Sequence, residues 1–200
     1  MNAKKPLPEE ETRQRILAAA AERFVQFGYN KTTMAELARD CDMSAANLYR
    51  YFDSKLDIGA KLACDCLETK RILLRGIVEQ KERSAAARLR DVVMQSLDYT
   101  HGQWADNPRM NEMVNAICGE RMDIVEEHRR GEHRLLVELI TDGIARGEFQ
   151  TDDVDDSATA IATAITAFNV PLLMPLYSLE SFRKRAESVV KLLLNGLNKR

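Results

Sequence analysis

One stretch, residues 33–55 (TMAELARDCDMSAANLYRYFDSK), constrains the fold of this chain more than any other. It begins with the pattern of a capping box, in which Thr33 and Glu36 satisfy each other's helix-terminal backbone groups. Apolar residues then recur at the spacing of one helix face as far as Cys41. After a two-residue break, Ser44 can cap a second short helix. Two short helices joined by a few residues predict a helix-turn-helix.

The surface of the predicted second helix suits contact with DNA. Its first turn, residues 44–47, is small and polar, so the backbone can approach base edges closely. Long donors follow at Tyr49, Arg50 and Tyr51, and no carboxylate between positions 43 and 52 repels phosphate. In a helix-turn-helix the second helix enters the major groove. The alternative is a solvated surface helix in an ordinary helical protein.

The segment from residue 16 to residue 55 resembles the TetR family of one-component transcriptional regulators. In the family pattern, the first helix ends in Phe-x-x-x-Gly followed by Tyr or Phe, and a Thr-Thr pair leads the second helix. The pattern finishes with Leu-Tyr-x-(Tyr or His)-Phe-x-x-Lys. These marks stand in the sequence at Phe24, Gly28, Tyr29, Thr32, Thr33, Leu48, Tyr49, Tyr51, Phe52 and Lys55. The rest of the chain is similar to the family in length and helical character only.

The resemblance implies an all-α protein of about nine helices. We expect an N-terminal three-helix helix-turn-helix DNA-binding domain over residues 1–53. A C-terminal helical bundle over residues 54–200 would bind an effector and form a dimer. The DNA-binding residues that we expect are Thr33, Ser44, Ala45, Ala46, Asn47, Tyr49, Arg50, Tyr51 and Lys55.

Each of these residues has an expected role. Thr33 and Ser44 fix the helices and offer backbone N–H groups to phosphates. The small residues 45–47 face base edges, and Arg50 reaches guanine or phosphate. Both tyrosines and Lys55 mainly position the protein on the DNA backbone.

The composition fits a globular protein and gives no support for nucleic-acid binding. Of the 200 residues, 45% are hydrophobic and 30% are charged, and the formal net charge is −2. Residues 1–60 carry nine Lys or Arg and nine Asp or Glu, so affinity for DNA has to come from local placement of charge. Lys4 and Lys5 can contact phosphate or belong to a disordered tail.

Localisation can also be predicted from the sequence. The N-terminal arm lacks the apolar region of a signal peptide, and no apolar run is long enough to span a membrane. Four cysteines show no paired spacing, which predicts free and mostly buried thiols in a reducing compartment. We therefore expect a cytoplasmic protein.

Beyond the helix-turn-helix, the apolar periodicity predicts helices and no strand. A long helix starting near Ser54 would act as a lever that re-aims the second helix of the helix-turn-helix when its far end moves. The other helices are expected over residues 10–27, 84–102, 109–117, 119–146, 155–170 and 178–197.

The last two predicted helices are the candidate dimer interface. Small Ala and Thr residues in the helix over 155–170 allow close packing, and the resemblance implies that this pair meets its copy in a four-helix bundle. A second copy also lets a protein read two DNA half-sites about one helical turn apart, roughly 34–36 Å. The alternative is that the pair is intramolecular core.

A small-molecule effector pocket is expected in the C-terminal part. Methionines adapt to varied apolar ligands, and a lone Trp near a helix break can form a cavity wall. The sparse polar groups there suggest a mainly apolar or aromatic effector. Ordinary core packing is the alternative for each candidate. The candidate ligand-binding residues are His101, Trp104, Met110, Met113, Asn115, Cys118, Met122 and Phe168.

The motif content argues against metal, cofactor and catalytic chemistry. His128 and His133 are five residues apart, which misses the i, i+4 spacing of a helical metal pair. Nucleophile-elbow, phosphate-loop and zinc-protease motifs are missing, so we expect no cofactor and no enzyme.

These inferences predict a homodimeric repressor that binds a palindromic operator and is released by a small, mainly apolar effector. Ligand binding would favour a state in which the two DNA-reading helices are wrongly spaced for adjacent grooves. The alternative is a DNA-bound interaction protein of the same fold without an effector.

Overall fold

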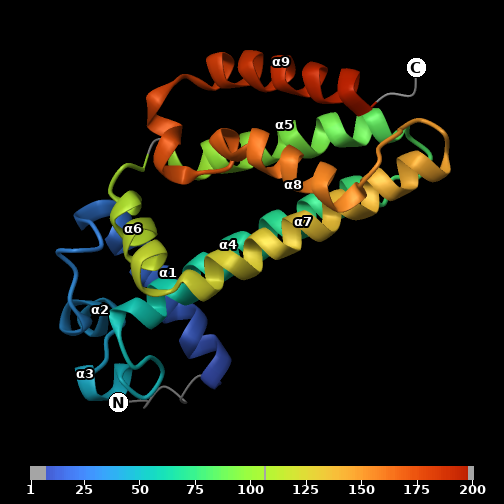
Figure 1. Cartoon of the computed structure of the whole chain (residues 1–200). Coiled ribbons are helices and arrows are strands. Elements are labelled where there is room, and N and C mark those ends of the chain that lie inside the picture. The colour runs from blue at the N-terminus through green and yellow to red at the C-terminus, as the bar shows by residue number, and fades with distance from the viewer. Residues whose placement is uncertain (1–7, 106, 198–200) are drawn as a thin grey trace. The chain divides into compact units, whose positions relative to one another are not determined.

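The computed structural model describes residues 8–105 and 107–197 (Figure 1). Lys4 and Lys5 lie outside these ranges. The described residues form helices and connecting turns, with no β-strand among them, which confirms the predicted all-α fold.

Contacts within the chain divide it into two compact units. The first comprises Met1–Asp65 and Arg109–Met122, and the second comprises Cys66–Pro108 and Asp123–Arg200. This division differs from the boundary after residue 53 that the sequence predicts. The dividing point falls inside one continuous helix, α4 (Lys55–Val78), and a segment from the middle of the chain joins the first unit.

The first unit begins with α1 (Glu9–Phe27). Three glutamates in its first turn lie at the positive end of the helix dipole and favour helix formation there. The helix stops at Gly28, whose φ of +91° is rare for residues with a side chain, and the Gly28 N–H donates to Phe24 O at 3.0 Å. A Cβ at this position would also come within 3.0 Å of Glu112 Oε2. The predicted glycine stop is therefore confirmed.

Three more helices complete the first unit together with the beginning of α4. These are α2 (Met34–Asp40), α3 (Ala45–Leu48) and α6 (Met110–Glu120). Helix α1 packs on α2, α2 packs on α3, and α6 packs on α1. Full burial of a Leu or Phe side chain contributes roughly 1.5–3 kcal/mol, so their shared core fixes the position of α3. Its buried side chains include Ile16, Leu17, Ala20, Phe24, Met34, Leu37, Ala38, Leu48, Phe52 and Ile58.

The second unit is built around α5 (Ala85–Trp104), which packs on α9 (Leu179–Leu197). Figure 1 shows α5 lying between α9 and α8 (Val154–Ala164). The long helix α7 (Met122–Ala145) runs beside the second part of α4, to which ion pairs connect it.

A fully buried arginine, Arg88 on α5, connects three helices of the second unit. Its Nη1 donates to Val78 O at the end of α4 at 2.8 Å, and its Nη2 pairs with Asp142 on α7. The same pairing holds the pKa of the Asp142 carboxyl below its usual range. Because these contacts lie inside the unit, they fix the ends of α4 and α7 against α5.

The region after α8 differs from the sequence prediction. A helix is expected up to residue 170, but α8 ends at Ala164 and two 3₁₀ segments follow, Thr166–Phe168 and Pro171–Leu176. Pro171 explains why no helix continues through residue 170, because its ring disfavours the helical conformation of the residue before it, but it does not explain the end of α8 at Ala164. Val170 accordingly has extended backbone angles of φ −90° and ψ 114°.

The four cysteines form no disulfide, but they are less buried than expected. Cys41 is buried, Cys66 and Cys118 are half-buried, and Cys64 is exposed. Burial raises the pKa of the Cys41 thiol, so this side chain behaves as a small apolar core residue.

Candidate nucleic-acid interface and ligand cavity

The predicted capping box is present at the start of α2. Thr33 Oγ1 accepts from the Glu36 N–H at 3.3 Å, and Glu36 Oε2 accepts from the Thr33 N–H at 2.9 Å. The side chain of Glu36 also lies 3.6 Å from Arg23 Nη1. Since the Thr33 N–H is used inside the box, Thr33 positions α2 and does not offer that N–H to phosphate.

Helix α3 is shorter than predicted. Ser44 caps it as expected, with Ser44 Oγ accepting from the Asn47 N–H at 3.2 Å. Regular helix ends at Leu48, and the segment up to Tyr51 forms turns. The Phe52 N–H still donates to Leu48 O at 3.2 Å, so the chain continues the same winding. Leu48 and Phe52 are both buried, which fixes the inner side of this segment.

The outer side of this segment, which we call the outward face, is formed by the exposed residues Ser44, Ala46, Tyr49 and Arg50. Tyr49 as a residue is 50% exposed although it follows a buried leucine. The other expected contact residues of this helix, Ala45, Asn47 and Tyr51, are half-buried. The outward face therefore presents two long side chains beside two small ones.

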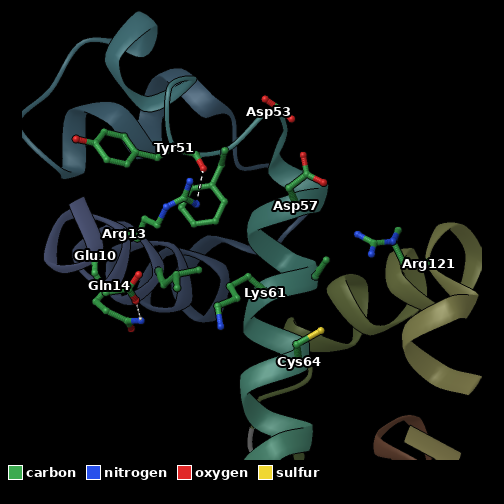
Figure 2. A pocket seen from close by; sticks show the side chains of 12 residues that line it. Glu10, Arg13, Gln14, Tyr51, Asp53, Asp57, Lys61, Cys64 and Arg121 are labelled. Atoms are coloured by element: carbon green, nitrogen blue, oxygen red, sulfur yellow. Dashed lines mark hydrogen bonds between the residues drawn. The ribbon is translucent and has the colours of Figure 1, made fainter. Parts of the chain in front are cut away.

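The turn after α3 is held on α1 by Arg13. Figure 2 shows Arg13 Nη1 donating to Tyr51 O, at a distance of 2.7 Å. The Arg13 guanidinium also lies 5.3 Å from the centre of the Phe52 ring, a cation–π arrangement. A hollow of about 340 Å³ opens beside these residues, with Cys64 and Arg121 in its wall. Arg13 thus orients the outward face from within the first unit.

The ammonium group of Lys55, expected to contact phosphate, has partners within the first unit. Its Nζ donates to Tyr29 O at 2.7 Å and lies 4.3 Å from the centre of the Tyr29 ring. Burial lowers the pKa of the Lys55 ammonium group, with smaller opposing effects from Glu112 and Glu36. The ammonium group is therefore used to fix the start of α4 to the turn that follows α1.

The eight candidate ligand-binding residues do not form one site within either unit. Most of them belong to the first unit, where Met113 is buried and would contact a side chain placed at Gly59, whereas Met122 is 51% exposed. In the second unit, His101 and Phe168 both approach the ring of Phe182, at 6.2 and 6.4 Å between centroids. The members in the first unit are Met110, Met113, Asn115, Cys118 and Met122, and those in the second are His101, Trp104 and Phe168.

The second unit contains a small cavity with other residues in its wall, which we call the α5–α7 cavity. Its volume is about 20 Å³, which is room for about one water molecule. Most of the wall is apolar, and three polar side chains interrupt it: Ser96, Glu132 and Asn169. Ser96 Oγ donates to Asn169 Oδ1 at 2.6 Å. The apolar wall residues are Leu74, Val92, Leu135, Leu136, Ala162 and Ile165.

A buried charge cluster lies next to this cavity. Glu132 Oε1 is 3.2 Å from Lys70 Nζ and 3.3 Å from His128 Nε2, yet it accepts no well-directed hydrogen bond. Only 3% of the Lys70 side chain is exposed. Burial by itself would raise the pKa of the Glu132 carboxyl, but the partners outweigh it and hold the value at about 2. Glu132 therefore carries a fixed negative charge at neutral pH.

Sequence reasoning missed this cluster, although two signals mark it. Lys70, Leu74 and Ile77 recur at the i, i+4, i+7 spacing of one helix face. Because the other two are buried apolar residues, this spacing predicts that the Lys70 side chain is also buried. His128 and Glu132 are four residues apart on α7, the spacing of a side-chain pair on one helix face.

Two further classes of site are missing from the described residues. Within residues 8–105 and 107–197, no group of three or more His, Cys, Asp or Glu side chains could hold a metal ion. Within the same ranges, none of the helices combines the length and the apolar character needed to cross a bilayer.

Comparison with known proteins identifies both parts of the chain. Residues 16–60 match the family described as bacterial regulatory proteins, tetR family. Residues 85–190 match the family described as tetracyclin repressor-like, C-terminal domain. The HTH-type transcriptional repressor KstR2 of Mycobacterium tuberculosis is 24% identical over 145 residues, which cover 72% of each chain.

Two solved structures show a similar fold. SmeT, the repressor of the Stenotrophomonas maltophilia multidrug efflux pump SmeDEF, aligns with a TM-score of 0.70 at 16% identity, over 96% of this chain and 92% of its own. The transcriptional regulator FadR of Bacillus subtilis, solved in complex with stearoyl-CoA, aligns with a TM-score of 0.67 at 20% identity, over 92% of this chain and 98% of its own. Because the C-terminal family match alone covers more than half of the sequence and a second match covers the helix-turn-helix, the chain belongs to the TetR family of bacterial transcriptional regulators.

Proposed function

We propose that this regulator is a homodimeric repressor of the bacterial cytoplasm that binds a two-fold symmetric DNA operator and is released by a small effector. As a member of a family of transcriptional regulators, the chain is not an enzyme. The observation that carries the proposal is the outward face, where Tyr49 and Arg50 stay exposed on a segment whose inner side is buried.

The outward face supports contact with DNA through its shape and its donors. Ala46 leaves the backbone open to close approach, and the Arg50 guanidinium can donate two parallel hydrogen bonds to guanine or bind phosphate. The Tyr49 hydroxyl is a donor that suits phosphate oxygen. Half-buried Asn47 is a weaker candidate for adenine. We leave Lys55 out of the proposed contact set because its ammonium group already has partners in the first unit.

Dimerisation through α8 and α9 is supported by apolar side chains that remain exposed there. Leu192 on α9 is 72% exposed, and half-buried Val189 lies beside it on the same helix face. On α8, Ala160 and Ala164 are exposed and small, so another helix can pack closely against them. Covering these side chains with a second copy would remove apolar surface from water, at about 25 cal/mol per Å².

An effector role is supported by the relatives and by the α5–α7 cavity. FadR of Bacillus subtilis was solved with stearoyl-CoA, a small molecule with a long apolar chain. In this chain the cavity has a mainly apolar wall inside the second unit. An effector that binds one conformation of this unit better than another would shift the population toward that conformation. Helix α4 has residues in both units and can transmit such a shift.

The second candidate function is a DNA-bound interaction protein without an effector. The observation that favours it is the volume of the α5–α7 cavity, about 20 Å³, which is too small for any organic ligand unless the wall moves. Under this alternative the outward face and the dimer remain, and no small molecule changes DNA affinity.

Selection of bound duplexes from a random DNA pool tests the proposal. Full-length protein should enrich one sequence with two-fold symmetry, whose half-sites lie about one helical turn apart. The double variant Tyr49→Ala/Arg50→Ala, which changes only exposed side chains, should enrich nothing. Enrichment of an asymmetric site would contradict the dimer, and failure of the wild type to enrich any site would contradict DNA binding.

Sedimentation equilibrium tests the dimer independently of DNA. The wild type should sediment as a dimer at micromolar concentration, and Leu192→Glu should shift the protein toward monomer by placing a charge in the interface. Lys191→Glu is the matched control, because it changes charge on the neighbouring exposed position, about 100° around the helix. A monomeric wild type, or a dimer that Leu192→Glu leaves intact, would refute this part.

A further inference from the structure

We propose that the α5–α7 cavity is the effector site in a contracted form and that it takes an apolar molecule bearing a hydrogen-bond donor, such as a phenol, an alcohol or an amine, in preference to a carboxylate. The inference rests on the proposed effector function and specifies the chemistry of the ligand. Three polar side chains in the wall, Ser96, Glu132 and Asn169, carry the argument.

Two of these three side chains offer only acceptors to a ligand. The hydroxyl hydrogen of Ser96 is used in the 2.6 Å bond to Asn169 Oδ1, which leaves the lone pairs of Ser96 Oγ. Ionised Glu132 is an acceptor by its nature, and its Oε1 still lacks a well-directed hydrogen bond. Ser96 is 1% exposed, so bulk water cannot easily donate a hydrogen bond to its hydroxyl oxygen. A ligand with an N–H or O–H group can donate to the lone pairs of Ser96 Oγ and add a donor to the Glu132 carboxylate, beside Lys70 and His128.

The charge cluster strengthens the preference for a ligand with a hydrogen-bond donor over a carboxylate. The partners of Glu132, the Lys70 ammonium group and the His128 ring, contact it but do not line the cavity themselves. A ligand in the cavity therefore lies against the Glu132 side chain, whereas the compensating charge of Lys70 lies outside the wall. Because Glu132 holds its charge at neutral pH, a carboxylate ligand would bring a like charge into an apolar cavity. The cluster itself is costly to bury, and the fold of an all-α bundle does not require it.

The cavity has to expand before it can hold such a ligand. At about 20 Å³ it accommodates about one water molecule, which can donate to the same acceptors. A ligand donor would replace that water, and its apolar body would separate the walls formed by α5, α7 and α8. The site should therefore bind only molecules whose apolar surface, once buried, contributes more free energy than separating the walls requires.

Four probes with the same ring system test the ligand class: 2-naphthol, 2-naphthylmethylamine, naphthalene and 2-naphthoate. Binding to the full-length protein is measured by isothermal titration calorimetry and by the shift in melting temperature, without DNA. We expect the naphthol and the amine to bind at least about tenfold more tightly than naphthalene, because they can donate a hydrogen bond to a charged acceptor and naphthalene cannot. The naphthoate should bind weakest.

Two alanines provide a matched test of the location. Ala162→Met fills the cavity from α8, and it should abolish binding of the naphthol while the protein stays folded. Ala145→Met makes the same change at an exposed position on α7, and binding should remain as in the wild type. Glu132→Gln should reduce the preference for the amine over the naphthoate at least severalfold.

The outcomes separate this inference from the proposed function. Naphthoate binding as tight as the naphthol, naphthol binding unchanged in Ala162→Met, or no binding of any probe would overturn the inference. None of these results touches DNA recognition, which the selection experiment measures on its own. If selection fails while the probes behave as expected, the repressor proposal falls and the ligand site stands.

Discussion

The buried pair of Lys70 and Glu132 yields the sharpest stability prediction. Glu132→Gln keeps the shape of the side chain and removes its charge. The pKa of Glu132 is about 2 in the folded protein, against 4.5 without the fold, which corresponds to about 3 kcal/mol at 1.36 kcal/mol per pH unit. Since the folded pKa is the lower one, this stability is fully present above pH 4.5 and is lost as the pH falls toward 2.

The assay is thermal unfolding followed by circular dichroism between pH 7 and pH 3. For a chain of this length about 3 kcal/mol corresponds to a melting temperature roughly 6–12 °C lower in Glu132→Gln at pH 7. The gap between wild type and variant should shrink as the pH drops below 4.5. Glu68→Gln is the control, because Glu68 pairs with Arg71 in an exposed position and should change little. A gap that stays constant with pH would refute the reasoning.

Three further substitutions test other parts of the structure, each by chemical denaturation of the full chain. Gly143→Ala should destabilise by about 1–3 kcal/mol, because the added Cβ would lie 2.4 Å from Phe149 Cδ2, and an unchanged midpoint would contradict this packing. Thr33→Ala should cost about 1 kcal/mol through loss of the cap on α2, whereas no loss would mean that the capping box does not form in solution. Lys55→Met should cost about 1–2 kcal/mol by leaving Tyr29 O without its charged donor, while the folded protein keeps its DNA affinity. A stable variant with reduced DNA affinity would instead restore the phosphate role of Lys55.

The parts of the fold that depend on local sequence could be predicted without the structure. The capping box at Thr33, the cap at Ser44 and the stop at Gly28 all follow from neighbouring residues, and the structure contains each of them. Apolar periodicity likewise located α1, α4, α5, α7 and α9 to within a few residues. These signals are strong because helix ends and helix faces are set by interactions over three to seven positions.

The features that depend on contacts between distant residues could not be predicted in the same way. The sequence around Lys55 predicts an exposed lysine, whereas the fold places its ammonium group beside the Tyr29 carbonyl. The prediction of the ligand-binding residues rests on residue type alone, and the structure distributes these residues over two units. The pairing of Lys70 with Glu132 joins residues that are 62 positions apart. Local spacing places Lys70 on an apolar face and His128 beside Glu132, but it does not indicate that Lys70 and Glu132 meet.

DNA affinity of single variants tests the central claim, that the outward face reads the operator, most directly. Fluorescence anisotropy with the selected duplex should show Tyr49→Ala and Arg50→Ala binding about ten- to a hundredfold more weakly than the wild type, with unchanged melting temperatures. Lys184→Ala removes the same charge from an exposed position on α9 and should bind like the wild type. If both variants on the outward face bind the operator with wild-type affinity, this segment does not read DNA and the account is wrong.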